Sequence, residues 1–191
     1  MFTFAFPFNR TATVARTEQV RKPEKPGLED LVKLARGLMR DGNPQAALGS
    51  LAPWKDDTDG CPEARLLIGR ALLALNRYPE AIQQLEAFLE FRPESMEGLL
   101  AAGIAAARLS EFAKAADLSN RAAMQLVGPA RSLLKSLGSG SKPDPVAIEE
   151  MMADIEADRT DRDRGLALAC ALAKAGHFRV AEKYMWVFDV D

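Results

Sequence analysis

Residue types that carry catalytic or metal chemistry are scarce in this chain. Among its 191 residues there are one histidine and two cysteines. The histidine, His177, falls in a predicted turn, and the sequence contains no cysteine–histidine pairing, no glycine-rich phosphate loop and no serine-centred nucleophile elbow. We therefore expect no catalytic residues, no metal site and no cofactor, and we interpret the chain as a protein that is not an enzyme.

An excess of charge of one sign is also lacking. Lys and Arg together number 25, Asp and Glu together number 27, and the formal net charge is -2. No block of five or six like charges occurs, whereas a nucleic-acid-binding protein usually carries a concentrated basic patch. The composition therefore argues against nucleic acid as a partner.

Long apolar runs are absent as well. None reaches the roughly 18 to 20 residues that a helix needs to span a membrane, and the start of the chain is too short and too aromatic for the core of a signal peptide. Cys61 and Cys170 are expected to be free thiols, because a chain that is 48% apolar does not need a disulfide. Cys170 falls on the apolar face of a predicted helix. These features predict a cytoplasmic protein.

What the sequence does contain is an internal repeat of constant length. Residues 62 to 95 place apolar side chains at helical spacing, pause at Asn76 and Arg77, and resume until Pro93, which predicts two helices joined by a tight turn. The pattern recurs directly before this copy and directly after it, without an insertion. Two positions carry small residues in all three copies, as a close helix crossing requires. They are Ala35, Gly69 and Gly103 at the first position, and Ala47, Ala81 and Ala115 at the second.

The repeat length, the positions of the small residues and the predicted turn resemble those of the tetratricopeptide repeat family. Residues 62 to 95 match its pattern through Ile68, Gly69, Leu72, Tyr78, Ala81, Leu85 and Pro93. Residues 96 to 129 match through Leu99, Gly103, Phe112, Ala115 and Ala122. The chain departs from the pattern at Trp54, Arg65, Phe88 and Val127. The resemblance implies an all-α fold, a right-handed solenoid of antiparallel helix hairpins.

We divide the chain into two parts. Residues 1–27 are expected to form a phenylalanine-rich extension and linker, and residues 28–191 the helical repeat domain. The repeats are placed at about 28–61, 62–95 and 96–129, followed by a degenerate copy at 130–161 and a further match at 162–191. In the degenerate copy a Gly/Ser-rich loop precedes a helix that Asp144 and Pro145 begin.

The resemblance also implies a concave surface lined by the first helix of each hairpin, which serves as the partner-binding groove. Its apolar members are too many to leave in water on one surface, so a covering segment is expected from a partner or from this chain. Its arginines suit the carboxylates of a bound peptide. The alternatives are apolar packing between hairpins and ordinary solvated charge. The groove residues are Arg36, Arg40, Leu66, Arg70, Leu73, Leu100, Ile104 and Arg108.

One known ligand class of the family is not expected. Members that hold the acidic tails of heat-shock chaperones use Lys and Asn at defined repeat positions, where this chain has Val32, Arg36 and Leu67. An apolar or amphipathic segment with a few acidic residues suits the groove better.

The start of the chain, FTFAFPF, places four phenylalanines at alternate positions, on one side of an extended strand. A polar stretch with Pro23 and Pro26 follows, which suits a linker. We interpret the rings as an anchor in the chain's own groove, in a neighbouring copy's groove through self-association of residues 1–10, or on another protein. The alternative is a mobile end. The anchor residues are Phe2, Phe4, Phe6 and Phe8.

The function expected from these features is a protein–protein interaction module or assembly scaffold, which binds an extended or helical segment of another protein and performs no chemistry. Two alternatives stay open. One is a chaperone of the bacterial secretion type for an apolar client. The other is an accessory subunit of a larger enzyme or membrane complex, docked through residues 1–10.

Overall fold

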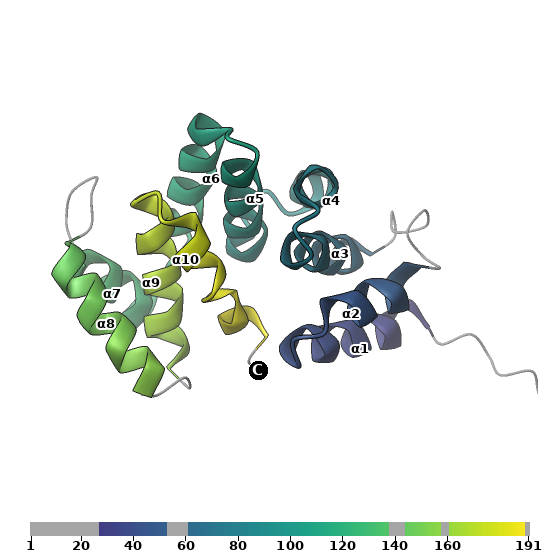
Figure 1. Ribbon diagram of the computed structural model, residues 1–191, viewed down its shortest axis with the longest axis horizontal. Coiled ribbons are helices and arrows are strands. Elements are labelled where there is room, and N and C mark those ends of the chain that lie inside the picture. The colour runs from purple at the N-terminus through teal and green to yellow at the C-terminus, as the bar shows by residue number, and fades with distance from the viewer. Residues whose placement is uncertain (1–26, 53–60, 138–143, 158–160, 190–191) are drawn as a thin grey trace, which may run out of the picture.

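The computed structural model describes residues 27–52, 61–137, 144–157 and 161–189, and within these ranges it contains helices and no strand (Figure 1). A 3₁₀ helix, Met185–Phe188, follows the last α-helix. The α-helices are α1 (Leu28–Arg40), α2 (Pro44–Leu51), α3 (Pro62–Ala74), α4 (Tyr78–Phe91), α5 (Met96–Arg108), α6 (Phe112–Met124), α7 (Gly128–Ser136), α8 (Pro145–Ala157), α9 (Arg162–Lys174) and α10 (Phe178–Glu182).

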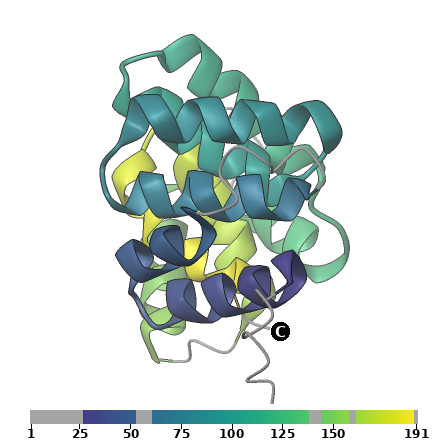
Figure 2. The same cartoon turned by 90° about the vertical axis from the view of Figure 1, so that its right-hand side faces the viewer.

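Sequential helices pack as antiparallel hairpins, α1 with α2, α3 with α4, α5 with α6, and α9 with α10. The second helix of one hairpin packs on the first helix of the next, α2 on α3 and α4 on α5. Figure 2 shows these layers of helices from the α1–α2 end. The predicted all-α solenoid is thereby confirmed.

The fourth layer is built differently from the first three. Helix α9 packs against α6, as the next helix of the stack would, and it also contacts both α7 and α8. The region expected as a degenerate hairpin therefore meets the rest of the molecule largely through α9, at the far end of the arch from α1 (Figure 1).

All four hairpin turns use the same backbone conformation. One residue shortly after each first helix has a positive φ, between 59° and 83°. The next N–H donates to the carbonyl five residues earlier and satisfies the end of the helix. The first three of these residues stand 34 positions apart, so the constant repeat length places the same turn in each of the first three hairpins. The positive-φ residues are Gly42, Asn76, Ser110 and Gly176.

The aligned small residues lie where paired helices cross, as predicted. A Cβ atom on Gly69 of α3 would stand 2.6 Å from Leu85 Cγ and 3.5 Å from the carbonyl oxygen of Ala81 in α4. A Cβ atom on Gly103 of α5 would stand 3.4 Å from the carbonyl oxygen of Ala115 in α6. A larger side chain at either glycine would push the two helices apart.

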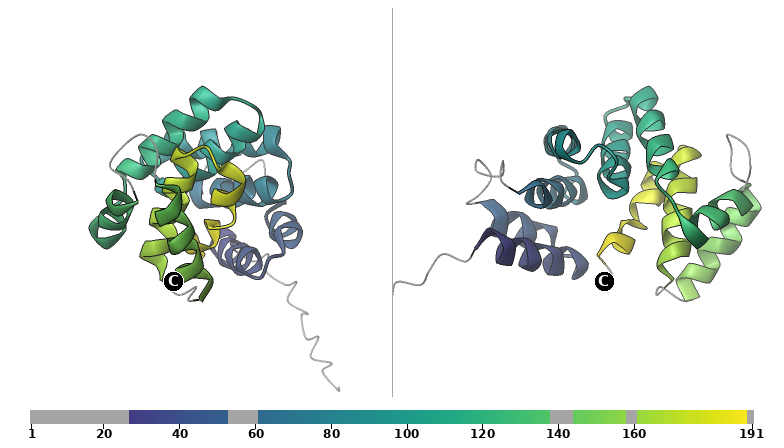
Figure 3. Two further views of the ribbon diagram at one scale, coloured as in Figure 1. Left: turned by 60° about the vertical axis from the view of Figure 1, so that its left-hand side comes forward. Right: turned by 180° about the vertical axis from the view of Figure 1, so that it is seen from behind.

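The chain departs from the repeat pattern after α10. This helix ends at Glu182, after five residues, whereas α4 and α6 continue for 14 and 13 residues. The following residues turn into the hollow side of the arch, between α9 and the first helices of the earlier hairpins (Figures 1 and 3). We call residues 184–189 the inner segment.

Candidate functional site

The apolar residues predicted to line the groove are buried. Leu66 and Leu73 of α3 are 4% and 3% exposed, and Leu100 and Ile104 of α5 are fully buried. All four belong to one hydrophobic cluster that also contains Tyr184, Met185, Val187 and Phe188 of the inner segment. These residues are therefore buried within this chain, through packing between the first helices of the hairpins and in the same cluster as the inner segment.

Arg70 of α3 is the centre of the polar contacts on the concave face, the face of α1, α3 and α5 that looks into the hollow of the arch. Its side chain is 4% exposed. Its two Nη atoms donate to the two carboxylate oxygens of Asp189, at 2.7 and 2.6 Å. Nη1 also donates to Glu97 Oε1 of α5 at 2.7 Å, and Nη2 to the carbonyl oxygen of Met185 at 3.2 Å. One buried guanidinium therefore joins α3, α5 and the inner segment.

Burial and pairing act in opposite directions on these charges. Burial alone would lower the pKa of Arg70, but the hydrogen bond to Asp189 and the negative charges of Glu97 and Asp189 outweigh it and raise that pKa. The pKa of Glu97 is raised as well: burial is the largest cause and raises it, the charges of Arg70 and Arg36 lower it, and the nearby Asp189 raises it. Arg70 thus stays charged, while Glu97 carries a desolvation cost that its partners do not fully offset.

Helix α1 contributes a basic rim beside this network. Arg36 Nη1 donates to the carbonyl oxygen of Phe188 at 3.1 Å. Lys33 and Arg40, on the same side of α1, are exposed. Together with Gly37 and Asp189, these three basic residues line a cavity of about 180 Å³. We call Lys33, Arg36 and Arg40 the rim. Their positive charges surround an opening next to the buried Asp189 carboxylate.

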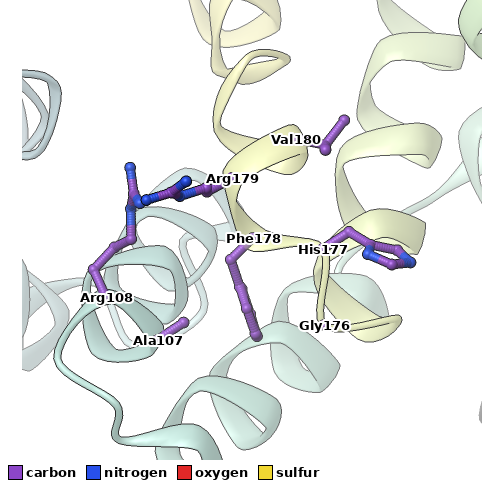
Figure 4. Close-up of a pocket in the computed structure, with 7 residues that line it drawn as sticks. All are labelled: Ala107, Arg108, Gly176, His177, Phe178, Arg179 and Val180. Carbon is purple, nitrogen blue, oxygen red and sulfur yellow. The ribbon is translucent and has the colours of Figure 1, made fainter.

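Arg108, the last predicted groove arginine, lies at the other end of the concave face. Its Nη2 donates to Glu182 Oε2 at 3.3 Å, and its guanidinium lies 5.1 Å from the centre of the Tyr78 ring. Burial raises the pKa of Glu182, and the charges of Arg108 and Arg179 partly offset this. A cavity of about 420 Å³ lies here between α5 and α10, and Figure 4 shows Arg108 and Arg179 reaching toward each other across it while the His177 ring points elsewhere.

The structure thus brings Arg36, Arg70 and Arg108 into contact with residues 182–189, and it leaves Arg40 exposed on the rim. The anchor residues Phe2, Phe4, Phe6 and Phe8 lie outside the described residues. The repeat pattern does not reveal Asp189 and Glu182, because it places residues 162–191 in one more repeat. The available signal was the aromatic and acidic run WVFDVD, which lacks the small residues of a second repeat helix.

Neither a membrane span nor a metal site is found in the part of the chain that the structure describes. None of its helices is both long and apolar enough to cross a membrane. In the same residues, no group of three or more His, Cys, Asp or Glu side chains is arranged to hold a metal ion.

Comparison with known proteins agrees with the repeat. A family model described as tetratricopeptide repeat matches residues 32–95 and, in an overlapping second match, residues 66–129. The two matches together cover just over half of the chain. No curated protein sequence matches it significantly.

Two solved structures are similar to the chain at low sequence identity. The MamA RS-1 ArsTM double mutant is 20% identical with a TM-score of 0.45, over 83% of this chain and 93% of that chain. MamA 41-end from Desulfovibrio magneticus RS-1 is 19% identical with a TM-score of 0.45, over 81% of this chain and 91% of that chain.

Proposed function

The chain belongs to the tetratricopeptide repeat family, a family of protein–protein interaction modules and scaffolds, and we propose that it holds a partner's polypeptide segment on the concave face of α1, α3 and α5. The observation that carries this proposal is the inner segment itself. The concave face already holds residues 184–189, from a distant part of the sequence, through Arg70 and Arg36, and the apolar residues of this segment belong to the same hydrophobic cluster as the leucines of α3 and α5.

The exposed charges favour a partner segment with acidic residues. Lys33, Arg36 and Arg40 lie along one side of α1 around the cavity beside Asp189. Positive charges gathered at an opening attract a negatively charged segment and orient its approach. The module acts by rigid presentation of this surface and performs no chemistry of its own.

The test is affinity capture from the native cell extract with a charge-reversed rim, Lys33→Glu with Arg40→Glu. Both side chains are exposed, so the variant is expected to keep its fold, whereas substitutions of the buried Arg70 or Leu66 would disturb the core. The matched control is Arg131→Glu with Lys135→Glu, which makes the same charge change on exposed positions of α7.

We expect the rim variant to lose at least one captured protein that the intact chain and the α7 control both retain. Equal capture by all three proteins would contradict the proposal. A single secreted client that is insoluble alone would instead favour the secretion-type chaperone. A stoichiometric complex that is lost on deleting residues 1–10 would favour the accessory subunit.

A further inference from the structure

The inner segment is held in the way that a bound peptide is held. It supplies apolar side chains to the hydrophobic cluster, and its backbone carbonyls at Met185 and Phe188 accept hydrogen bonds from Arg70 and Arg36. Its last described residue, Asp189, is 5% exposed and pairs with Arg70 through both carboxylate oxygens. Affinity from the main chain combined with one charged anchor is typical of short-peptide recognition.

Helix α9 lies on the other side of the inner segment from α3, and it leaves space for a side chain of that segment. Gly165 of α9 faces Val187, and a methyl group placed on Gly165 would overlap Val187 Cγ1. The Val187 Cβ atom lies 3.6 Å from the same position, which is an ordinary van der Waals separation. The glycine therefore makes room for the branched side chain of Val187.

We propose that the inner segment occupies the partner's place, and that the partner is a short peptide of the same chemistry, an apolar or aromatic turn followed by a carboxylate that takes the place of Asp189 on Arg70. The inference rests on the proposed function and adds to it the chemistry of the partner and a competing segment. The concave face cannot stay bare, because Arg70 would then lose its Asp189 partner and the apolar residues of the inner segment would leave the hydrophobic cluster.

Competition within one chain favours the inner segment. A tethered segment acts at an effective concentration on the order of millimolar. A free peptide of equal intrinsic affinity therefore gains access only when the inner segment is weakened. The intact chain is expected to bind such peptides poorly, and this expectation makes the proposal testable by weakening the inner segment alone.

The experiment pairs a variant of Gly165 with peptides that do or do not fit it. Gly165→Ala in the full chain is expected to expel Val187 while leaving α1, α3 and α5 unchanged. The probes are fluorescently labelled peptides with the sequence of residues 182–189, EKYMWVFD, either unchanged or with Val187→Ala. A third probe carries Val187→Ala together with Asp189→Asn. The readout is fluorescence anisotropy.

We expect the Gly165→Ala chain to bind the Val187→Ala peptide at least tenfold more tightly than the unchanged peptide. Adding Asp189→Asn to that peptide should weaken binding at least tenfold, because the paired carboxylate is lost. The intact chain and Gly49→Ala are expected to bind all three peptides weakly, since Gly49 lies in α2 and a methyl group added there would meet no heavy atom within 4 Å.

A second variant tests the proposal without changing α9, in case Gly165→Ala disturbs the folding of that helix. Asp189→Asn in the full chain leaves Gly165 and Arg70 in place and should bind the unchanged peptide at least tenfold more tightly than the intact chain does. The proposal is overturned if neither variant binds any peptide. It is equally overturned if the peptides with and without Asp189→Asn bind with the same affinity. It is also overturned if Gly165→Ala merely forms a dimer. These failures would leave the capture result with the rim variant standing, so the two proposals fail separately.

Discussion

A single residue in each hairpin turn decides where the chain reverses. Gly42, Asn76, Ser110 and Gly176 stand at the same place in their turns and share a left-handed backbone conformation. Glycine adopts this conformation without strain, and asparagine tolerates it better than most other residues. Serine has no such advantage, so the third turn carries the most unfavourable of the four residues.

The first prediction concerns these turns. Gly42→Ala and Gly176→Ala should each lower the free energy of unfolding by about 1 kcal/mol, because a Cβ atom is strained at a left-handed φ. No heavy atom lies within 4 Å of the added methyl group at either site, so the cost is one of backbone conformation alone. Urea denaturation followed by circular dichroism measures it.

The matched controls are Gly37→Ala in α1 and Gly49→Ala in α2, which also add a methyl group to open space but at a helical φ. They should raise the free energy of unfolding by about 0.5 to 1 kcal/mol, because alanine favours a helix over glycine. The same direction of change in all four variants would disprove the turn argument.

The second prediction concerns the two thiols. Cys170 is fully buried in α9, and burial raises the pKa of its thiol to about 12, while Cys61 is half-buried. Because the thiolate is the reactive form, a disulfide reagent at a pH of about 8 should modify one thiol in the native protein and two after denaturation. In Cys61→Ser the native reaction should disappear, and modification of native Cys61→Ser would contradict the buried position of Cys170.

At the scale of elements, the helices of the middle layers are held on two sides. Helix α3 packs on α4 and α2, and its concave side meets the inner segment through Arg70. Helix α5 packs on α6 and α4 and offers Glu97 to the same guanidinium. One ionic network therefore couples the second and third hairpins to residues that follow α10.

The third prediction tests this coupling. Arg70→Ala should lower the free energy of unfolding by about 3 to 5 kcal/mol, since it leaves the carboxylates of Glu97 and Asp189 buried without their partner. The control is Arg92→Ala, which removes an exposed ion pair with Glu63 and should cost no more than about 1 kcal/mol. Chemical denaturation of both variants measures the difference, and equal losses would mean that the network adds no stability.

At the scale of the whole molecule, buried acids make stability depend on pH. Burial raises the pKa of Glu97 and of Glu182 above the ordinary glutamate value. The folded protein then binds these protons more tightly than the unfolded chain does. The stability contributed by the two acids is therefore fully present below the ordinary glutamate pKa and is lost as pH rises through the raised folded-state pKa.

The fourth prediction isolates Glu97 from the other acids. Glu97→Gln keeps a hydrogen-bond acceptor for Arg70 but removes the titrating group, so the intact chain should gain stability relative to this variant when pH falls from about 7.5 to about 5. Urea midpoints at the two pH values give the comparison, with Glu94→Gln, an exposed glutamate, as the control for the change of charge. A loss of stability of the intact chain relative to Glu97→Gln as pH falls would contradict the raised pKa of Glu97.

Much of the solenoid follows from the sequence because its decisive contacts are short-range. Gly69 meets Ala81 and Leu85, and Gly103 meets Ala115, all within one repeat. A constant repeat length with small residues at the crossings is therefore enough to predict hairpins and their stacking. The sequence also marked Arg36, Arg70 and Arg108 as groove residues, since their repeat positions place them on the first helices.

Only the tertiary structure decided what covers the concave face. The Arg70–Asp189 pair joins residues 119 positions apart, and no periodicity connects them. The contact depends on how far the stacked hairpins curve and on α10 ending at Glu182, which sends the inner segment back toward α3. The local sequence pattern determined the stacked hairpins of this protein. The curvature that builds up over all the stacked layers determined which segment covers their concave face.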